Sequence, residues 1–409
     1  MRRSSFLIRV IGIGVLLHIY VGSRLIPEWP FGTPAKAAAV VWLVLSCVLI
    51  PLGVLARYFV KRQRLADRMA WIGLLVMGYF SSLLVITFVR DLSIASLLTI
   101  DSLLPRTVSL DRWRVDSAVG VPLLAMISTA IGFINARRRA KVASVDIPIA
   151  DLPPELDGLT IVQISDIHVG PTIKRSYVEA IVAEVNRLEA DVIAVTGDVV
   201  DGSVAQLAEH TRPLGRLKAK YGAFLVTGNH EYYSGAEEWI AEFQRLGLQV
   251  LLNDHVVLEH NGAPFVVAGV TDYSAGHFND AHRSDPAAAV RHAPDDARIR
   301  VLLAHQPRSA LAAAEAGYTL QLSGHTHGGQ FFPWNFFVRF QQPFTAGLAR
   351  IDDLWIYTSR GTGYWGPPKR LGAPSEITRI RLVADTRVPG TVSGMRKGNR
   401  RAQAIRAAG

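Results

Sequence analysis

The sequence of 409 residues predicts a two-part protein, in which an all-α transmembrane bundle of about four helices precedes a larger α/β domain. Two observations predict this. Long apolar stretches are confined to the first third, whereas short apolar runs alternate with helical patterns from about residue 159. Charge divides the chain similarly: residues 1–143 hold 18 Lys and Arg against 6 Asp and Glu, and residues 144–386 hold 20 against 28. Residues 387–409, with six basic residues and no acid, are predicted to be a disordered tail.

The first part contains four apolar stretches, near residues 6–23, 37–60, 69–89 and 117–135. Each is close to the length that crosses the hydrocarbon core of a bilayer. Their centres contain no Asp, Glu, Lys or Arg, and His18 is the one ionisable side chain well inside them. Transporters place ionisable groups along a pathway within the spans, so we interpret the bundle as an anchor and disfavour a transporter with an accessory domain.

Basic residues beside these stretches predict their orientation. The loop at 61–68 has four basic residues against one aspartate, and residues 137–141 contribute four more, whereas the two other loops are poor in charge or balanced. The positive-inside rule then places the N-terminus, the 61–68 loop and everything after residue 136 on the cytoplasmic side, and we expect a multi-pass membrane protein. The first stretch also fits a cleavable signal peptide, and cleavage would leave the final orientation unchanged.

Composition limits the chemistry of the second part. The single cysteine, Cys47, lies in an apolar stretch, which excludes an intrachain disulfide and a cysteine-based metal site. The net acidic charge of residues 144–386 argues against nucleic-acid binding, since a basic patch on the folded domain is the usual signature of that function. Eleven of the twelve histidines fall in this acidic range, which points to imidazole chemistry there.

The α/β pattern consists of short apolar strands that end in polar clusters and are separated by helices. The strands are expected at about 159–164, 191–195, 223–226, 300–303 and 319–322, and the helices at about 174–190, 203–220, 235–247 and 308–316. Buried strands that alternate with helices predict sheets covered by helices. Ligands of such sheets bind beyond the carboxyl ends of the strands, so we expect the five polar clusters to meet.

These clusters supply two carboxylates, one amide and four imidazoles as candidate metal ligands: Asp166, His168, Asp198, Asn229, His305, His325 and His327. Asp166 and His168 are two residues apart on an emerging strand, so that both side chains can point the same way, and the last two histidines repeat this spacing. Such nitrogen and oxygen ligands suit Mn, Fe or Zn. Seven are too many for one ion and fit two, provided that one carboxylate bridges them.

The series Asp166-x-His168, Gly197-Asp198, Gly228-Asn229-His230-Glu231, His305 and Gly324-His325-x-His327 resembles the calcineurin-like metallophosphoesterases, over roughly residues 157–385. The resemblance implies a four-layer α/β/β/α metallophosphoesterase sandwich with two divalent metal ions. It assigns Asp166, His168, Asp198 and His327 to one ion, and Asp198, Asn229, His305 and His325 to the other, so that Asp198 bridges.

The resemblance also implies the reaction, which is hydrolysis of a phosphoric ester by attack of a hydroxide held between the ions. His230 would lie beside the scissile phosphate, stabilise the transition state and protonate the leaving oxygen, and Asn229 would also contact the phosphate. Residues 359–363 and 374–377 resemble the membrane-associated bacterial branch, which includes phosphodiesterases and a pyrophosphatase acting on UDP-diacylglucosamine. This resemblance implies a bacterial inner membrane as the location. It also implies a phosphodiester or pyrophosphate substrate at the bilayer, with a lipid-linked one as a candidate.

Two alternatives stay open at this point. The protein could be a non-catalytic metal-binding membrane sensor or scaffold, although such a protein has no use for His230. The aromatic run at 331–340, directly after the last ligand motif, fits either core packing or a rim that dips into the membrane, since aromatic residues favour the interface.

Overall fold

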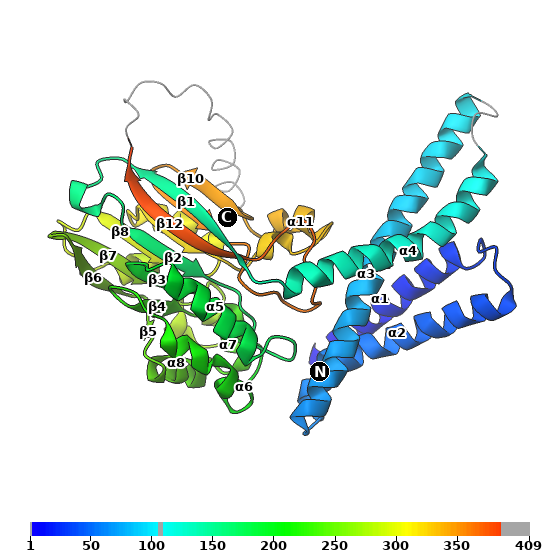
Figure 1. Cartoon of the computed structure of the whole chain (residues 1–409), viewed down its shortest axis with the longest axis horizontal. Helices are drawn as coiled ribbons and strands as arrows, with labels where there is room; N and C mark the ends of the chain where they lie inside the picture. Colours follow the sequence, from blue (N-terminus) through cyan, green and yellow to red (C-terminus); the bar gives the residue numbers. More distant parts are fainter. Residues whose placement is uncertain (1, 105–108, 386–409) are drawn as a thin grey trace. The chain divides into compact units, whose positions relative to one another are not determined.

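The computed structural model describes residues 2–104 and 109–385, with side chains from Arg9 onward. These residues form two compact units (Figure 1). The helical unit comprises the chain up to Arg137 together with residues 366–371, and the α/β unit comprises residues 138–365 and the chain from Gly372. The predicted boundary at residue 143 stays a prediction, and the predicted tail at 387–409 lies outside the described residues.

The helical unit is built from α1 (Arg2–Leu25), α2 (Thr33–Phe59), α3 (Gln63–Leu103) and α4 (Leu110–Arg137). Three of them, α2, α3 and α4, are long and apolar enough to cross a membrane, and α1 covers the first predicted stretch. Helices α2 and α3 cross closely at Gly53 and Gly73, where a Cβ atom on Gly53 would stand 2.6 Å from the Cα atom of Gly73.

Helix α3 is longer than the sequence pattern predicted. The apolar stretch ends near residue 89, which predicts a loop from Arg90, but the helix continues to Leu103. Arg90 does not end the helix because its charge is paired inside the unit, where it is 4% exposed. Its Nε atom donates to Ser117 Oγ at 2.9 Å, and its guanidinium forms an ion pair with Glu28. The sequence from 90 to 103 also contains no glycine or proline.

Residues 366–371 belong to the helical unit although they lie far along the chain. Lys369 is 2% exposed, and its ammonium group donates a hydrogen bond to the hydroxyl of Ser82 in α3. The backbone N–H of Arg370 donates to the carbonyl of Gly132 in α4 at 2.8 Å. This segment therefore joins α3 to α4 through polar contacts.

The α/β unit contains two six-stranded sheets with the strand orders β1-β12-β2-β3-β4-β5 and β10-β11-β9-β8-β7-β6 (Figure 1). Strands β2 to β5 are parallel, as are β7, β8, β9 and β11. The strands of the first sheet are β1 (Lys141–Ile149), β2 (Thr160–Ile164), β3 (Val192–Thr196), β4 (Ala223–Val226), β5 (Gln249–Val250) and β12 (Glu376–Ala384). Those of the second are β6 (Asp254–His260), β7 (Ala263–Gly269), β8 (Ile299–Leu303), β9 (Leu320–Ser323), β10 (Gly347–Ile351) and β11 (Leu354–Thr358).

The sheets pack face to face, as the alternating side chains of β7 show. Phe265 and Val267 belong to a core shared with residues of the first sheet such as Phe224. Val266 and Ala268 face the opposite way, into a second core that contains residues of α9 (Pro286–Ala289) and α10 (Ala310–Glu315). Helices α5 (Arg175–Arg187), α6 (Val204–Thr211) and α8 (Ala236–Arg245) cover the first sheet (Figure 1). The structure therefore confirms the mixed α/β sandwich preceded by apolar helices.

The predicted strands correspond to β2, β3, β4, β8 and β9, and the predicted helices to α5, α6, α8 and α10, although α6 ends at Thr211, well before the predicted residue 220. The remaining short helices are α7 (Asn229–Ser234), α11 (Trp334–Phe337), η1 (Pro154–Leu156), η2 (Arg212–Arg216), η3 (Ala275–His277), η4 (Asp280–His282), η5 (Pro307–Ser309), η6 (His327–Gly329) and η7 (Val338–Phe340). Because the five predicted strands run parallel within their sheets, their carboxyl ends deliver the polar clusters to the same region of the unit.

Candidate metal centre

The structure brings all seven predicted ligands together at the carboxyl ends of five strands. Each strand contributes the side chains that follow it: Asp166 and His168 after β2, Asp198 after β3, Asn229 after β4, His305 after β8, and His325 and His327 after β9. Six of the seven are buried, and His325 is half-buried. Potential ligand atoms of three overlapping groups lie within 4.8 Å of one another.

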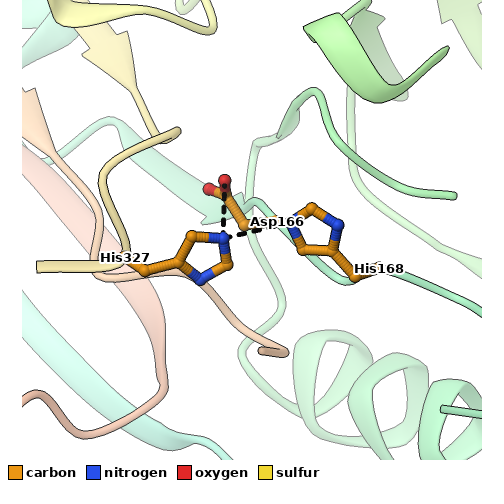
Figure 2. A group of neighbouring side chains, drawn as sticks. All are labelled: Asp166, His168 and His327. Carbon is orange, nitrogen blue, oxygen red and sulfur yellow. Dashed lines mark hydrogen bonds and ion pairs between the residues drawn. The ribbon is translucent and has the colours of Figure 1, made fainter. Parts of the chain in front are cut away.

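One group consists of Asp166, His168 and His327, whose side chains converge (Figure 2). The Nε2 atoms of the two histidines lie 3.0 Å apart, and Nε2 of His327 is 3.5 Å from Oδ1 of Asp166. Two imidazole nitrogens and a carboxylate oxygen facing one point are a donor set for a divalent cation.

A second group consists of Asp198, His305 and His325. Oδ2 of Asp198 lies 3.1 Å from Nε2 of His305, and that nitrogen lies 3.2 Å from Nδ1 of His325. The same Oδ2 atom is 3.9 Å from Nε2 of His168, which belongs to the first group. Asp198 thus lies between the two groups, where a bridging carboxylate would have to be.

The backbone at these ligands is unusual. Five of them have left-handed φ angles, between 51° and 69°, which side chains other than glycine rarely adopt: Asp166, His168, Asp198, His325 and His327. Strand β2 ends at Ile164, so Asp166 and His168 lie on a loop. Our prediction that strand alternation directs these two side chains was therefore wrong, and the left-handed backbone directs them instead. Such conformations cost free energy and persist where the surroundings enforce them, often at functional sites.

Close approach of the loops explains two glycines of the motifs. A Cβ atom on Gly324 would collide with Ser165 Oγ and with Oδ2 of Asp166, and one on Gly228 would collide with Oδ1 of Asp198. Both carboxylates therefore occupy space that any larger residue would fill.

Hydrogen bonds to the far side of two imidazoles set their tautomers. Nδ1 of His168 lies 3.1 Å from Oδ1 of Asp201, and Nδ1 of His305 lies 2.7 Å from the carbonyl oxygen of Thr196. A carbonyl oxygen and an ionised carboxylate can accept a hydrogen bond but cannot donate one. Each Nδ1 atom therefore carries the proton. When either imidazole is neutral, its Nε2 points into the site with the lone pair available, as metal-binding histidines require.

Asn229 provides a separate test of whether these residues fit a metal. Its Oδ1 atom is buried and has no hydrogen-bond partner in the part of the chain that the structure describes. An unsatisfied buried carbonyl oxygen is costly, and a cation would satisfy it. Together with the facing imidazole nitrogens, this atom indicates that the residues present fit a pair of divalent ions.

His230 also lies close to Asp198: the Nε2 atom of His230 is 4.0 Å from Oδ2 of Asp198. Its Nδ1 atom is 2.6 Å from Oδ1 of Asp201. Burial lowers the pKa of His230, but the carboxylates of Asp198 and Asp201 outweigh burial and raise the pKa to about 9. The imidazole is thus held as a proton donor at neutral pH, and bound cations would act in the opposite direction.

Burial and neighbouring charges also shift the pKa values of Asp198, His305 and His325. Burial raises the pKa of Asp198, but the histidines around it, His305 foremost, bring it well below the usual range. Burial lowers the pKa of His305, but Asp198 raises it well above the usual range. Burial and the neighbouring His305 lower the pKa of His325 to about 3, so this imidazole is neutral and able to bind a metal.

The motifs of the sequence assign no role to Asp201 or Glu231. Asp201 holds two imidazoles, as described above. Glu231 is fully buried, and its carboxylate accepts hydrogen bonds from the backbone N–H groups of Gly228, Asp198 and Val199 at 2.7–2.9 Å. It therefore ties the loop after β3 to the loop after β4. Both residues are acidic and lie two or three positions after a predicted ligand in the sequence, and this spacing could have marked them as candidates.

Two aromatic side chains, Tyr233 and Trp365, contact the ring of His230. The ring of Tyr233 has its centroid 5.2 Å from that of His230, and the ring of Trp365 lies at 5.6 Å. Tyr233 and Trp365 are both more than half exposed. Two partly exposed aromatic rings therefore contact His230.

Comparison with known proteins identifies the family. The calcineurin-like phosphoesterase family pattern matches residues 159–329. A transmembrane protein with a metallophosphoesterase domain from Danio rerio is 36% identical over 327 residues, which are 76% of this chain and 74% of the relative. A similarly named protein from Bos taurus is 38% identical over 298 residues, covering 66% of this chain and 67% of the relative.

An uncharacterized metallophosphoesterase of Helicobacter pylori (strain ATCC 700392 / 26695) is 38% identical over 255 residues, covering 62% of this chain and 66% of the relative. Among solved structures, a 5'-nucleotidase precursor from Thermus thermophilus gives a TM-score of 0.36 at 15% identity, over 61% of this chain and 58% of that chain, which is too remote to inform function. From the two transmembrane relatives and the family pattern it follows that the chain belongs to the calcineurin-like metallophosphoesterases and is a phosphoester hydrolase.

Proposed function

We propose that this protein is a membrane-anchored, dinuclear metal-dependent phosphodiesterase or pyrophosphatase whose substrate is a lipid or a nucleotide-linked lipid. The observation that carries the proposal is the position of Asp198 between the two groups of ligands, with His230 beside it. Two ions of Mn, Fe or Zn would supply an activated water nucleophile and neutralise charge on the phosphoryl oxygens.

Each residue of the site would have a defined role in this reaction. Asp166, His168 and His327 would hold one ion and His305, His325 and Asn229 the other, with Asp198 shared. His230 would donate its Nε2 proton to the leaving oxygen, because Nδ1 is occupied by Asp201. Asn229 would also orient a phosphoryl oxygen through its amide.

Three features support the membrane part of the proposal. Helices α2, α3 and α4 are long and apolar enough to cross a bilayer. The chain has relatives named as transmembrane proteins with a metallophosphoesterase domain. Basic residues in the 61–68 loop and after Arg137 favour a cytoplasmic α/β unit. A substrate that is itself embedded in the membrane gives such an anchor a purpose, since it concentrates the enzyme at the surface where the substrate lies.

The first test uses the purified full-length protein in detergent, loaded with Mn²⁺. Hydrolysis of bis(p-nitrophenyl) phosphate and of p-nitrophenyl phosphate is measured for the native protein and for Asp198→Asn, Asp198→Ala and His230→Ala. We expect turnover of the diester to exceed that of the monoester, to be abolished in both Asp198 variants, and to fall by about 10²–10⁴-fold in His230→Ala, which is the usual contribution of a general acid. His292→Ala, at an exposed histidine, is the matched control.

Metal content decides between the proposal and a binding-only protein. If elemental analysis finds two ions per chain and His230→Ala hydrolyses the diester as fast as the native protein, the assigned role of His230 is wrong. If two ions are bound and neither model substrate turns over, a screen of lipid-linked diesters and pyrophosphates follows, and failure there overturns the catalytic proposal in favour of a metal-binding sensor or scaffold.

A further inference from the structure

The α/β unit exposes an aromatic surface that the proposed chemistry does not use. Twelve large hydrophobic side chains of the described residues in this unit are exposed, and five of them fall between residues 332 and 340. We call these five the aromatic loop: Phe332, Trp334, Phe336, Phe337 and Phe340, with exposures of 46–76%. The sequence left core packing open for this run, and the exposure rules core packing out for these five side chains.

The rings of the aromatic loop pack against one another. Phe332 and Phe336 contact each other edge to face with centroids 5.8 Å apart, and Trp334 and Phe337 lie at the same centroid distance. Helix α11 and the following 3₁₀ turn η7 carry the rings. An ordered cluster of exposed phenylalanines and a tryptophan is unfavourable in water, and such clusters mark interaction sites.

Its charge favours an anionic surface. Residues 316–351 contain no Asp or Glu, and the charged residues among them are Arg339 and Arg350. Arg339 is exposed, and its guanidinium lies 5.5 Å from the centroid of the Phe340 ring. Arg308 reaches the same segment through a hydrogen bond to the carbonyl of Gln341. Aromatic rings flanked by arginines are typical of segments that lie in the interface of a bilayer with anionic head groups.

Chain connectivity favours a bilayer as the occupant over a second protein. Only residues 138–140 separate α4 from β1. Gln330, at the start of the aromatic loop, exchanges two hydrogen bonds with the backbone of Trp365, at 2.8 and 2.9 Å. The residue after Trp365 is the first of the segment 366–371, which belongs to the helical unit. The loop is thus tethered through the chain to the helices that are apolar enough to cross a membrane.

We infer that the aromatic loop inserts into the interfacial region of an anionic lipid bilayer. Asn335 of α11 packs against Gly329, two residues after the candidate ligand His327. Insertion would therefore hold the metal centre at the level of the lipid head groups. The inference rests on the membrane anchoring proposed above but not on catalysis, and its test separates the two.

Because the protein has a single native cysteine, a fluorophore can be attached at one chosen position at a time. In a Cys47→Ser background, Phe336→Cys and Phe340→Cys proteins are labelled with an environment-sensitive NBD fluorophore. The full-length chains are placed in vesicles of phosphatidylcholine and phosphatidylglycerol, with and without brominated acyl chains. Val257→Cys, at an exposed aliphatic residue of β6, is the matched control. The native protein labelled at Cys47, in α2, reports on membrane anchoring itself.

We expect the labels at 336 and 340 to be blue-shifted and to lose most of their emission to bromine, as the Cys47 label does, while the label at 257 is unaffected. Phosphatidylcholine alone should weaken the effect at 336 and 340. If Cys47 is quenched and both loop labels behave like the label at 257, the inference is wrong while the anchoring stands. A blue shift without bromine quenching that grows with the protein-to-lipid ratio would identify a second copy as the occupant and overturn it as well. If Cys47 is not quenched, the anchoring itself fails.

Discussion

The imidazole of His230 and the carboxylate of Asp201 are joined by the shortest hydrogen bond that His230 makes, with Nδ1 and Oδ1 2.6 Å apart. The same carboxylate oxygen lies 3.1 Å from Nδ1 of His168. Asp201 therefore orients a candidate metal ligand and the candidate general acid through one atom. The pKa of Asp201 is held below its usual range, because His168 and His230 outweigh the effect of burial, so this acceptor stays ionised.

Replacing Asp201 by Asn tests this double role. The amide keeps the size of the side chain but can present its NH₂ group, which no longer fixes a proton on Nδ1 of either histidine. We expect kcat for a diester to fall, and the affinity of the metal bound by His168 to weaken, by about 10–100-fold each, as is typical when the partner of a metal-binding histidine is lost. Asp353→Asn, at a fully exposed side chain, is the control in kinetics and metal titration. Native values for both quantities would contradict the assignment.

Glu231→Gln should destabilise the α/β unit. The glutamine keeps one carbonyl oxygen and turns an NH₂ group toward backbone N–H donors of Gly228, Asp198 or Val199, which leaves at least one of them unsatisfied. The expected loss is about 1–3 kcal/mol of unfolding free energy. Denaturant unfolding of the full-length protein in detergent measures it against Glu259→Gln, which alters an exposed side chain of β6. Equal midpoints for the two variants would show that Glu231 does not support the loops.

Gly324→Ala should disable the site by steric displacement. The new methyl group would overlap Ser165 Oγ and the Asp166 carboxylate, so that the carboxylate has to move. Overpacking of this kind costs about 1–3 kcal/mol, and we expect diester hydrolysis to be lost even where the variant folds. Gly276→Ala is the control, because a methyl group there meets its neighbours at 3.5 Å or more. Full activity and native metal content in Gly324→Ala would refute the close approach.

Metal removal should lower stability as well as abolish activity. Without cations, Asp166 and Asp198 are buried carboxylates and the Asn229 carbonyl is unsatisfied. Ligand linkage predicts about 2.7 kcal/mol of stabilisation per site at a free metal concentration of 100 Kd. Thermal unfolding after chelation and after return of Mn²⁺ measures the effect, and Asp198→Asn should show a smaller metal-dependent rise. If the melting temperature changes neither on chelation nor on return of Mn²⁺, no ion binds these ligands.

The ligands could be predicted from sequence because each follows an apolar strand, and parallel strands end at the same edge. The pattern could not give the path of the loops. The spacing of Asp166 and His168 predicts an extending strand, whereas their φ angles of 53° and 55° belong to a left-handed turn. That conformation depends on contacts with other loops, such as the N–H of His325 on Asp166, which no local pattern contains.

The outer strands show the same limit. Strands β6 and β7 form a hairpin around Asn261-Gly262, both with positive φ, and this dipeptide between apolar runs is a recognised hairpin signal that could have been used. The pairing of β1 with β12 joins Lys141 to Glu376 and could not have been found from local patterns. Arg90 likewise marked the end of a predicted span, because its partners Glu28 and Ser117 are distant in sequence.

The segment 366–371 has a consequence for how the protein is made. These six residues belong to the helical unit, yet the ribosome translates them after residues 138–365 have been synthesised. The first four helices can enter the membrane early in translation, but Lys369 cannot reach Ser82 until nearly all of the other unit has emerged. Completion of the helical unit is therefore a late step of biogenesis, and a nascent chain that stalls before residue 366 leaves α3 and α4 without the segment that joins them.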